Sequence, residues 1–249
     1  MNKSILAVLL LSCIISFPTM ALESRQERIE SCLSVWSSSD SVAKAQMLNR
    51  FQWSGLSDPQ LFDVVEQRVL DTYLQAGLDG KTINLIAYHV RALGYSGNEK
   101  YSETLSLVRS HTAVGKLKRH AKKALLDLSR FSEWNQLLSE ETQIFEDKSD
   151  EIATYMKMLN VDNVFVQRLA ARAIYHEQQR DQALLERAAE RLSKVYLQEN
   201  PGSEAEDTAA WLCKAIGQSQ RPEFIALLTK VASDTPSRKI ATYAKKYIR

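Results

Sequence analysis

The chain has 249 residues, with 32 Lys and Arg against 30 Asp and Glu and a formal net charge of +2. This near balance excludes a global electrostatic field that would recruit nucleic acid or anionic lipid. Gly (8) and Pro (5) are scarce while Leu, Ala, Glu, Gln, Lys and Arg dominate, a composition that favours helices over strands throughout.

The first element in chain order is a targeting sequence at residues 1–21. It has one Lys near its start, an apolar run at residues 5–17, and a small-x-small cleavage site that ends at Ala21. The run is shorter than the ~20 residues that cross a bilayer, which predicts a signal peptide and not a membrane span. We therefore expect a periplasmic or secreted protein whose mature chain, residues 22–249, has no transmembrane segment.

The three cysteines lie in different contexts. Cys13 ends the stretch "LLSC", which loosely resembles a bacterial lipoprotein box, so lipidation at Cys13 is the alternative to simple cleavage. Cys32 and Cys213 stay in the mature chain, near its opposite ends and among apolar residues. That context favours two small buried thiols, and a disulfide between them in an oxidising compartment is the alternative.

Apolar residues recur with helical spacing along the whole mature chain, and the breaks between periodic segments are short. Short connections imply that consecutive helices are antiparallel neighbours. The sequence therefore predicts an all-α fold. The predicted helices are residues 23–37, 41–53, 59–76, 81–93, 98–110, 116–130, 133–145, 149–159, 162–178, 181–198, 204–217, 222–232 and 237–248.

A repeat occurs within these helices, because residues 101–125 align with residues 224–248. The matched apolar pairs are Tyr101 and Phe224, Leu105 and Leu228, Val108 and Val231, Leu117 and Ile240, Ala121 and Ala244, and Leu125 and Ile248. The second helix has a third copy in Val166, Ala170 and Ile174. Residues spaced i, i+4 and i+8 share one helix face, and the central Ala lets a neighbouring helix approach closely. One pair of helices cannot bury such a stripe alone, so we expect the pairs to stack.

The segment "LKRHAKKAL" at residues 117–125 resembles the second helix of HEAT repeats, which stack into a curved α-solenoid. The usual Arg position of that motif holds Lys118 in one copy, and Gln167 and Ala241 in the others. The resemblance implies that residues 22–249 form one HEAT-like α-solenoid of stacked antiparallel helix pairs. An irregular helical bundle is the alternative.

Two segments resemble catalytic or phosphate-binding motifs, but each lacks one residue that the motif requires. His176 and Glu177 begin like a zinc-protease HExxH helix, but Arg180 occupies the second ligand position and cannot bind zinc. Residues 75–82 end in the Gly-Lys-Thr of a phosphate-binding loop, but Gln75 replaces its first Gly. No metal site or cofactor is predicted, and the chain is predicted not to be an enzyme. An enzyme with an unrecognised carboxylate pair in a helical cleft is the alternative, since such pairs meet only in three dimensions.

Basic residues crowd residues 116–123, but the apolar stripe of that helix explains most of them as its solvated face. The repeat register aligns Arg119 with Arg168, and Lys123 with both Arg172 and Lys246. Second helices line the concave side of a HEAT-like stack. We therefore hypothesise a basic ladder there, made of Arg119, Lys123, Arg168, Arg172 and Lys246.

Taken together, these features predict an exported, noncatalytic protein-binding scaffold or adaptor that uses the concave face of a solenoid. The predicted partners are other envelope proteins or an anionic envelope polymer. Trp134, placed just after a predicted helix start, is the predicted exposed aromatic anchor. Nucleic acid is not expected as a partner, because the exported chain is near neutral and its sequence lacks aromatic–basic interleaving.

Overall fold

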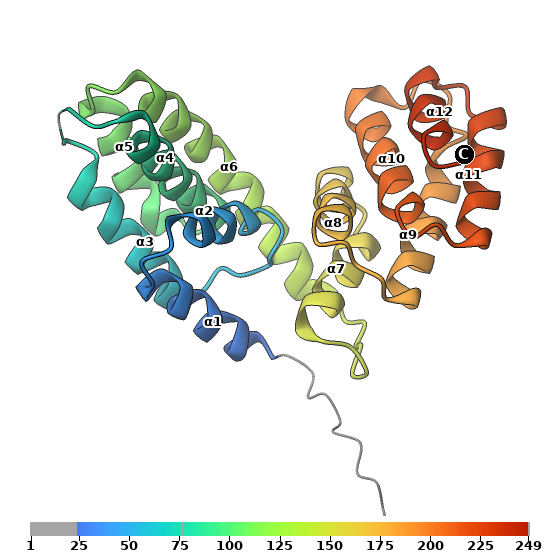
Figure 1. Ribbon diagram of the computed structural model, residues 1–249, viewed down its shortest axis with the longest axis horizontal. Coiled ribbons are helices and arrows are strands. Elements are labelled where there is room, and N and C mark those ends of the chain that lie inside the picture. Colours follow the sequence, from blue (N-terminus) through green and yellow to red (C-terminus); the bar gives the residue numbers. More distant parts are fainter. Residues whose placement is uncertain (1–23, 76, 249) are drawn as a thin grey trace, which may run out of the picture.

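The structure is a computed structural model that describes residues 24–75 and 77–248. Over these residues the chain forms twelve α-helices, one short 3-10 helix and loops, with no strand among them (Figure 1). The all-α prediction is therefore confirmed. The predicted signal peptide and Cys13 lie outside the described residues. Within the described ranges, no helix combines the length and the apolar character needed to cross a membrane.

The helices begin and end close to the predicted boundaries, with one exception described below. Short polar residues cap most of them; for example, the carboxylate of Asp79 accepts the backbone N–H groups that begin α4. The helices are α1 (Arg25–Ser37), α2 (Ser41–Arg50), α3 (Pro59–Thr72), α4 (Gly80–Tyr95), α5 (Ser102–His111), α6 (Gly115–Glu140), α7 (Asp150–Asn160), α8 (Val164–His176), α9 (Gln182–Val195), α10 (Gly202–Gly217), α11 (Pro222–Asp234) and α12 (Arg238–Lys245), with a 3-10 turn at Glu99–Tyr101 before α5.

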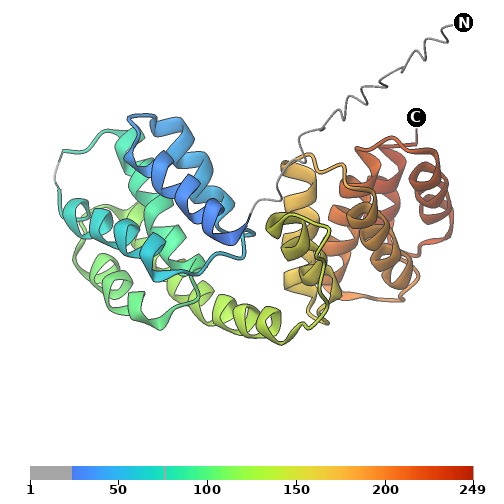
Figure 2. The ribbon, with the colours of Figure 1, turned by 90° about the horizontal axis from the view of Figure 1, so that it is seen from below.

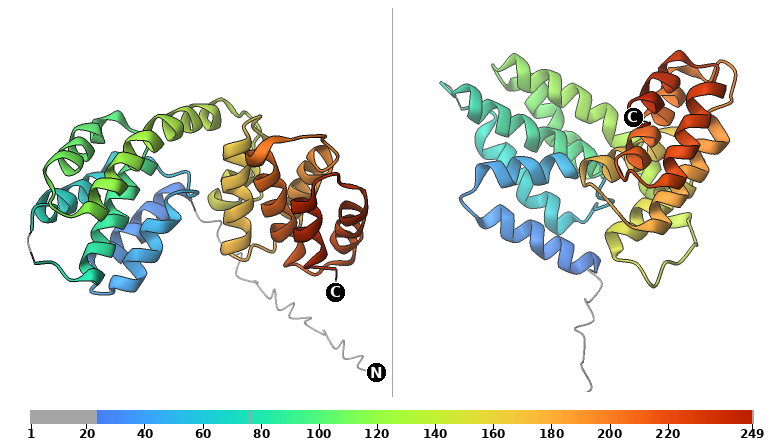
Figure 3. Two further views of the ribbon diagram at one scale, coloured as in Figure 1. Left: turned by 90° about the horizontal axis from the view of Figure 1, so that it is seen from above. Right: turned by 45° about the vertical axis from the view of Figure 1, so that its right-hand side comes forward.

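The helices form two groups, α1 to α6 and α7 to α12 (Figure 1). The C-terminal part of α6 reaches from the first group towards the second, as the view from below shows (Figure 2). Together the two groups describe an arc (Figure 3, left). Within each group the even-numbered helices pack side by side, α4 against α6 and α8 against α10, with α12 following α10. This arrangement aligns α8, α10 and α12, which carry the candidate site.

The prediction of two helices at residues 116–130 and 133–145 is wrong, because a single helix, α6, runs to Glu140 and residues 141–145 are not helical. No Gly or Pro interrupts this segment, and the buried stripe continues through Leu128, Phe131 and Trp134. Trp134 thus lies inside a continuous helix. It is 1% exposed, and its ring centroid lies 4.8 Å from that of Phe131. The prediction that Trp134 is an exposed anchor is therefore also wrong.

The apolar positions of the sequence repeat are almost all buried. The central alanines Ala121, Ala170 and Ala244 are fully inaccessible in α6, α8 and α12. Helices also approach closely at Gly94 in α4, where a Cβ atom would lie 2.8 Å from the backbone of Ala124 in α6. These small residues let neighbouring helices pack at short distance, as the stripe predicted.

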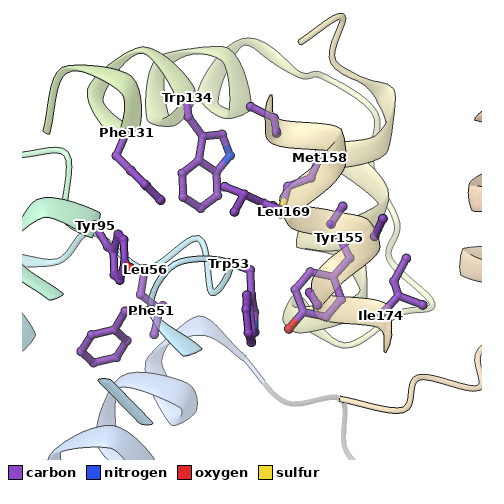
Figure 4. Close-up of a cluster of buried hydrophobic side chains, with 14 of the residues drawn as sticks. Phe51, Trp53, Leu56, Tyr95, Phe131, Trp134, Tyr155, Met158, Leu169 and Ile174 are labelled. Atoms are coloured by element: carbon purple, nitrogen blue, oxygen red, sulfur yellow. The ribbon is translucent and has the colours of Figure 1, made fainter. Parts of the chain in front are cut away.

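The two groups of helices share one apolar core at their junction (Figure 4). Phe51, Trp53 and Leu56 from the connection after α2 are buried there, with Trp53 facing Tyr155 of α7 and Phe51 and Leu56 on the side of Tyr95 of α4 (Figure 4). Ion pairs reinforce this junction: Arg28 of α1 pairs with Asp150, and its guanidinium also donates to the backbone carbonyl of Ser54 at 2.6 Å. The core and the ion pairs together fix where α1 and α2 lie relative to α7 and α8.

Candidate binding surface

Cations and aromatic rings alternate across α8, α10 and α12. We call this set of residues the "cation–aromatic ladder". In spatial order it consists of Trp53, Arg172, Trp211, Lys214, Tyr243 and Lys246. Arg172 comes from α8, Trp211 and Lys214 from α10, and Tyr243 from α12, with Lys246 at its C-terminal cap. The ladder therefore runs across three neighbouring helices and ends on the connection after α2.

Each cation lies within cation–π distance of at least one ring. The guanidinium carbon of Arg172 is 5.5 Å from the ring centroids of both Trp53 and Trp211. The ammonium of Lys214 is 3.6 Å from the centroid of Trp211 and 5.1 Å from that of Tyr243. The ammonium of Lys246 is 4.6 Å from the centroid of Tyr243. The rings thus hold three long side chains in defined positions.

No carboxylate in the described part of the chain pairs with these three cations. Among the described residues, no Asp or Glu lies within ion-pair distance of Arg172, Lys214 or Lys246. The Nε atom of Arg172 is buried and has no hydrogen-bond partner in that part of the chain. The ladder therefore presents unpaired positive charge, which is a complement for an anion.

Burial and mutual repulsion both act on the ladder. Burial lowers the pKa of Lys214, and the charges of Lys246 and Arg172 lower that pKa further. Burial likewise lowers the pKa of Arg172, together with the charges of Arg168 and Arg91. Both shifts mean that the surroundings disfavour the charged forms. An anionic ligand would relieve this repulsion. Binding of an anion therefore gains the free energy that the repulsion costs in the free protein.

His176 adds a titratable group beside the ladder. Its imidazole stacks on Trp53 at a centroid distance of 5.5 Å and an interplanar angle of 4°, and lies 5.5 Å from Trp211. Burial lowers the pKa of His176, and so do the nearby charges of Arg172 and Lys214. The imidazole is therefore neutral near pH 7, and an anion bound at the ladder would favour its protonated form.

The structure separates the five basic residues predicted from the repeat. Arg172 and Lys246 belong to the ladder. Arg168 lies over Phe165 at 5.7 Å but pairs with Glu204 at 2.9 Å and with Asp207 at 3.8 Å, so its charge is neutralised. Arg119 and Lys123 are exposed on α6.

The sequence-based interpretation missed Lys214 and the aromatic half of the ladder. Two aromatic–basic pairs could have been predicted from the sequence. Trp211 precedes Lys214 by three residues and Tyr243 precedes Lys246 by three, a spacing that places both side chains on one helix face. Aromatic–basic interleaving therefore exists in three dimensions although the linear sequence does not display it. Trp53 is distant in sequence and carried no such signal.

A partly open pocket of about 280 Å³ lies at the junction of α1, α2 and α7. Its polar lining groups bind one another: Arg50 pairs with Glu151 at 2.8 Å, and the hydroxyl of Tyr155 donates to Glu151 at 3.1 Å. Across residues 24–75 and 77–248, no cluster of three His, Cys, Asp or Glu side chains could hold a metal ion. Cys32 and Cys213 lie apart, Cys32 on α1 beside this pocket and Cys213 buried in α10, where burial raises the thiol pKa to about 12.

Three comparisons with known proteins were made, with protein families, curated proteins and solved structures. No protein-family model and no curated protein matches the sequence. A solved structure of human deoxyhypusine hydroxylase in complex with glycerol is similar over 90% of this chain and 89% of that chain, with 15% identity and a TM-score of 0.32.

The comparison contradicts the prediction that the chain is not an enzyme, because the similar structure is that of an enzyme. We therefore withdraw that prediction. At this identity and TM-score, the likeness carries no activity over to this chain.

Proposed function

We propose that this protein is exported and binds an acidic segment of another envelope protein through the cation–aromatic ladder. The observation that carries the proposal is the set of three cations, Arg172, Lys214 and Lys246, which aromatic rings hold in place and no described carboxylate neutralises. Side chains that are already fixed lose little conformational entropy when a ligand binds.

A HEAT-like stack of helix pairs is part of the same proposal. Its support is the equivalence of three helices, α6, α8 and α12, whose central alanines are all buried. The same register aligns Arg172 with Lys246, and both are ladder cations. Stacked repeats present extended surfaces of this kind to their partners.

A protein segment fits the ladder better than a uniform polyanion does. The rings of Trp211, Tyr175 and Tyr243 are each half-exposed between or beside the cations, so apolar surface alternates with positive charge. A segment that mixes acidic and apolar side chains can use both kinds of contact. A uniform polyanion without apolar or aromatic groups offers charge at every repeat and uses chiefly the cations.

Charge reversal tests the binding proposal. The triple variant Arg172→Glu, Lys214→Glu and Lys246→Glu is expected to weaken binding of a fluorescent poly-glutamate peptide about 100-fold, because three attractive contacts become repulsive. Fluorescence anisotropy measures the affinity, and circular dichroism checks that the variant is folded. A matched triple variant of exposed α6 cations, Lys118→Glu, Arg119→Glu and Lys123→Glu, is expected to change the affinity less than about threefold.

Two outcomes overturn the proposal. Equal loss in the two triple variants would mean that the peptide senses only net charge and not the ladder. Tighter ladder-dependent binding of an anionic polysaccharide or a single-stranded oligonucleotide would replace the protein segment as the partner. Export is tested separately by mass spectrometry of the mature N-terminus, which should begin at Leu22; a lipidated Cys13 would show instead that the protein is a lipoprotein.

A further inference from the structure

A further cation outside the ladder, Arg130 of α6, lies over an aromatic ring. Its guanidinium carbon is 5.5 Å from the ring centroid of Phe165 in α8, and that of Arg168 is 5.7 Å from the same centroid. The ring of Phe165 also packs edge-on against Phe131 of α6, at a centroid distance of 5.7 Å. Because α6 belongs to the first helix group and α8 to the second (Figure 1), Phe165 brings cations of both groups together.

The charge of Arg130 is exposed and unpaired in the described part of the chain. No Asp or Glu there lies within ion-pair distance of its guanidinium, and neither Asp127 nor Glu133, three residues away along α6 on either side, reaches it. Arg168, on the other side of Phe165, is neutralised by its carboxylate partners on α10. Arg130 therefore shares with the ladder cations the combination of a ring contact and a free positive charge.

Short steps connect Arg130 to the ladder. Arg130 and Arg168 share the ring of Phe165, and Arg168 precedes Arg172, the first ladder cation, by four residues in α8. Residues spaced i and i+4 lie on one helix face, about one turn apart. An extended polypeptide advances about 3.3 Å per residue, so a run of about six residues spans the ladder cations and about five more reach Arg130.

We propose that the acidic segment bound at the ladder continues past Phe165 to Arg130, so that one extended segment contacts both helix groups. Its main acidic run contacts the ladder cations, neutral residues lie beside the ion-paired Arg168, and a second, shorter acidic run contacts Arg130. This inference rests on the function proposed above and specifies the length and the charge pattern of the ligand. Its basis is a ring-bound, unpaired cation on α6 that shares Phe165 with α8.

Two fluorescent peptides of equal length test the inference on the full chain, and both have a central run of six Glu. In the reference peptide five Gln flank this run on each side, whereas in the extended peptide each flank has two Gln and then three Glu, so that either chain direction can bind. At about 0.15 M salt the extended peptide is expected to bind the wild-type protein about fivefold more tightly, because it also engages Arg130. In the variant Arg130→Gln this gain should disappear, while the affinity for the reference peptide stays within twofold of wild type.

Arg109→Gln provides the matched control, because Arg109 is also an exposed arginine of the first helix group but lies on α5, away from the contact with Phe165. This variant should keep the fivefold gain. A gain that is absent in the wild-type protein, that survives Arg130→Gln, or that disappears equally in Arg109→Gln overturns this inference and leaves the ladder proposal standing. Binding of the reference peptide that survives the triple ladder reversal overturns the proposed function, and this inference with it.

Discussion

The basic run of α6 and the cation–aromatic ladder both gather Lys and Arg, but their surroundings differ. Arg119 and Lys123 are exposed on one helix, close to one another in sequence. Arg172, Lys214 and Lys246 come from three segments and lie against rings at 3.6 to 5.5 Å. An exposed cation without a ring contact moves among many rotamers and is screened by water and salt, whereas a ring contact restrains a cation, including the exposed Lys246.

The contrast teaches that density of charge along a sequence is a poor guide to a binding site. The α6 run follows from an amphipathic helix whose apolar stripe is buried. The ladder keeps like charges together at an electrostatic cost: burial first, and then the charges of Lys246 and Arg172, lower the pKa of Lys214, and the ring contacts offset part of that cost. Such a cost is typical of functional sites.

The largest expected effect is a difference in stability between two variants, one at Trp134 of α6 and one at Trp211 of the ladder. Trp134→Ala should lower the free energy of unfolding by about 3–5 kcal/mol, because a fully buried ring leaves a cavity. Trp211→Ala should cost less than half as much, since Trp211 is only half-buried. Urea unfolding followed by circular dichroism measures both. Equal losses would contradict the assignment of one ring to the core and the other to the surface.

A smaller effect is expected on binding when a ring is removed without a change of charge. Trp211→Leu should weaken poly-glutamate binding about 10-fold, because Lys214 and Arg172 lose the ring that positions them. Trp36→Leu is the control, since Trp36 contacts His89 and Lys44 away from the ladder. Fluorescence anisotropy gives both affinities. An unchanged affinity in Trp211→Leu would mean that the rings do not position the cations.

The smallest effect is a pH dependence that runs through His176. The charged and titratable groups around its ring are Arg172, Lys214, Tyr175 and Glu177. Its pKa is lowered in the free protein, so a bound anion must raise it, and binding takes up a proton. The affinity for poly-glutamate should therefore rise about two- to threefold from about pH 7.5 to about pH 5.5. His176→Gln should abolish this rise, and a rise that persists would assign it to another group.

Helical periodicity predicted the all-α fold and most helix boundaries, because apolar stripes such as Leu117 and Ala121 must be buried wherever the helices pack. The same reasoning divided α6 at residues 131–132, where the composition contained no true helix breaker. Because of that error, Trp134 was predicted to be exposed, whereas it is buried in the core.

The candidate site was predictable only in part. The repeat register selected Arg172 and Lys246, which the structure brings into one ladder. Their separation from Arg119 depends on ring contacts and on the carboxylates around Arg168, which arise from tertiary packing. Trp53 contacts Arg172 although the two residues are more than a hundred positions apart in sequence. No local sequence pattern predicts this contact.

Indole N–H resonances provide the most direct test of the ladder. The four tryptophans sample different places: Trp53 and Trp211 in the ladder, Trp134 in the core and Trp36 on α1. Titration of ¹⁵N-Trp-labelled protein with poly-glutamate should shift the signals of Trp53 and Trp211 in parallel and leave those of Trp134 and Trp36 in place. Binding that shifts only Trp36, or shifts none of the four, would contradict the claim that the ladder is the binding surface.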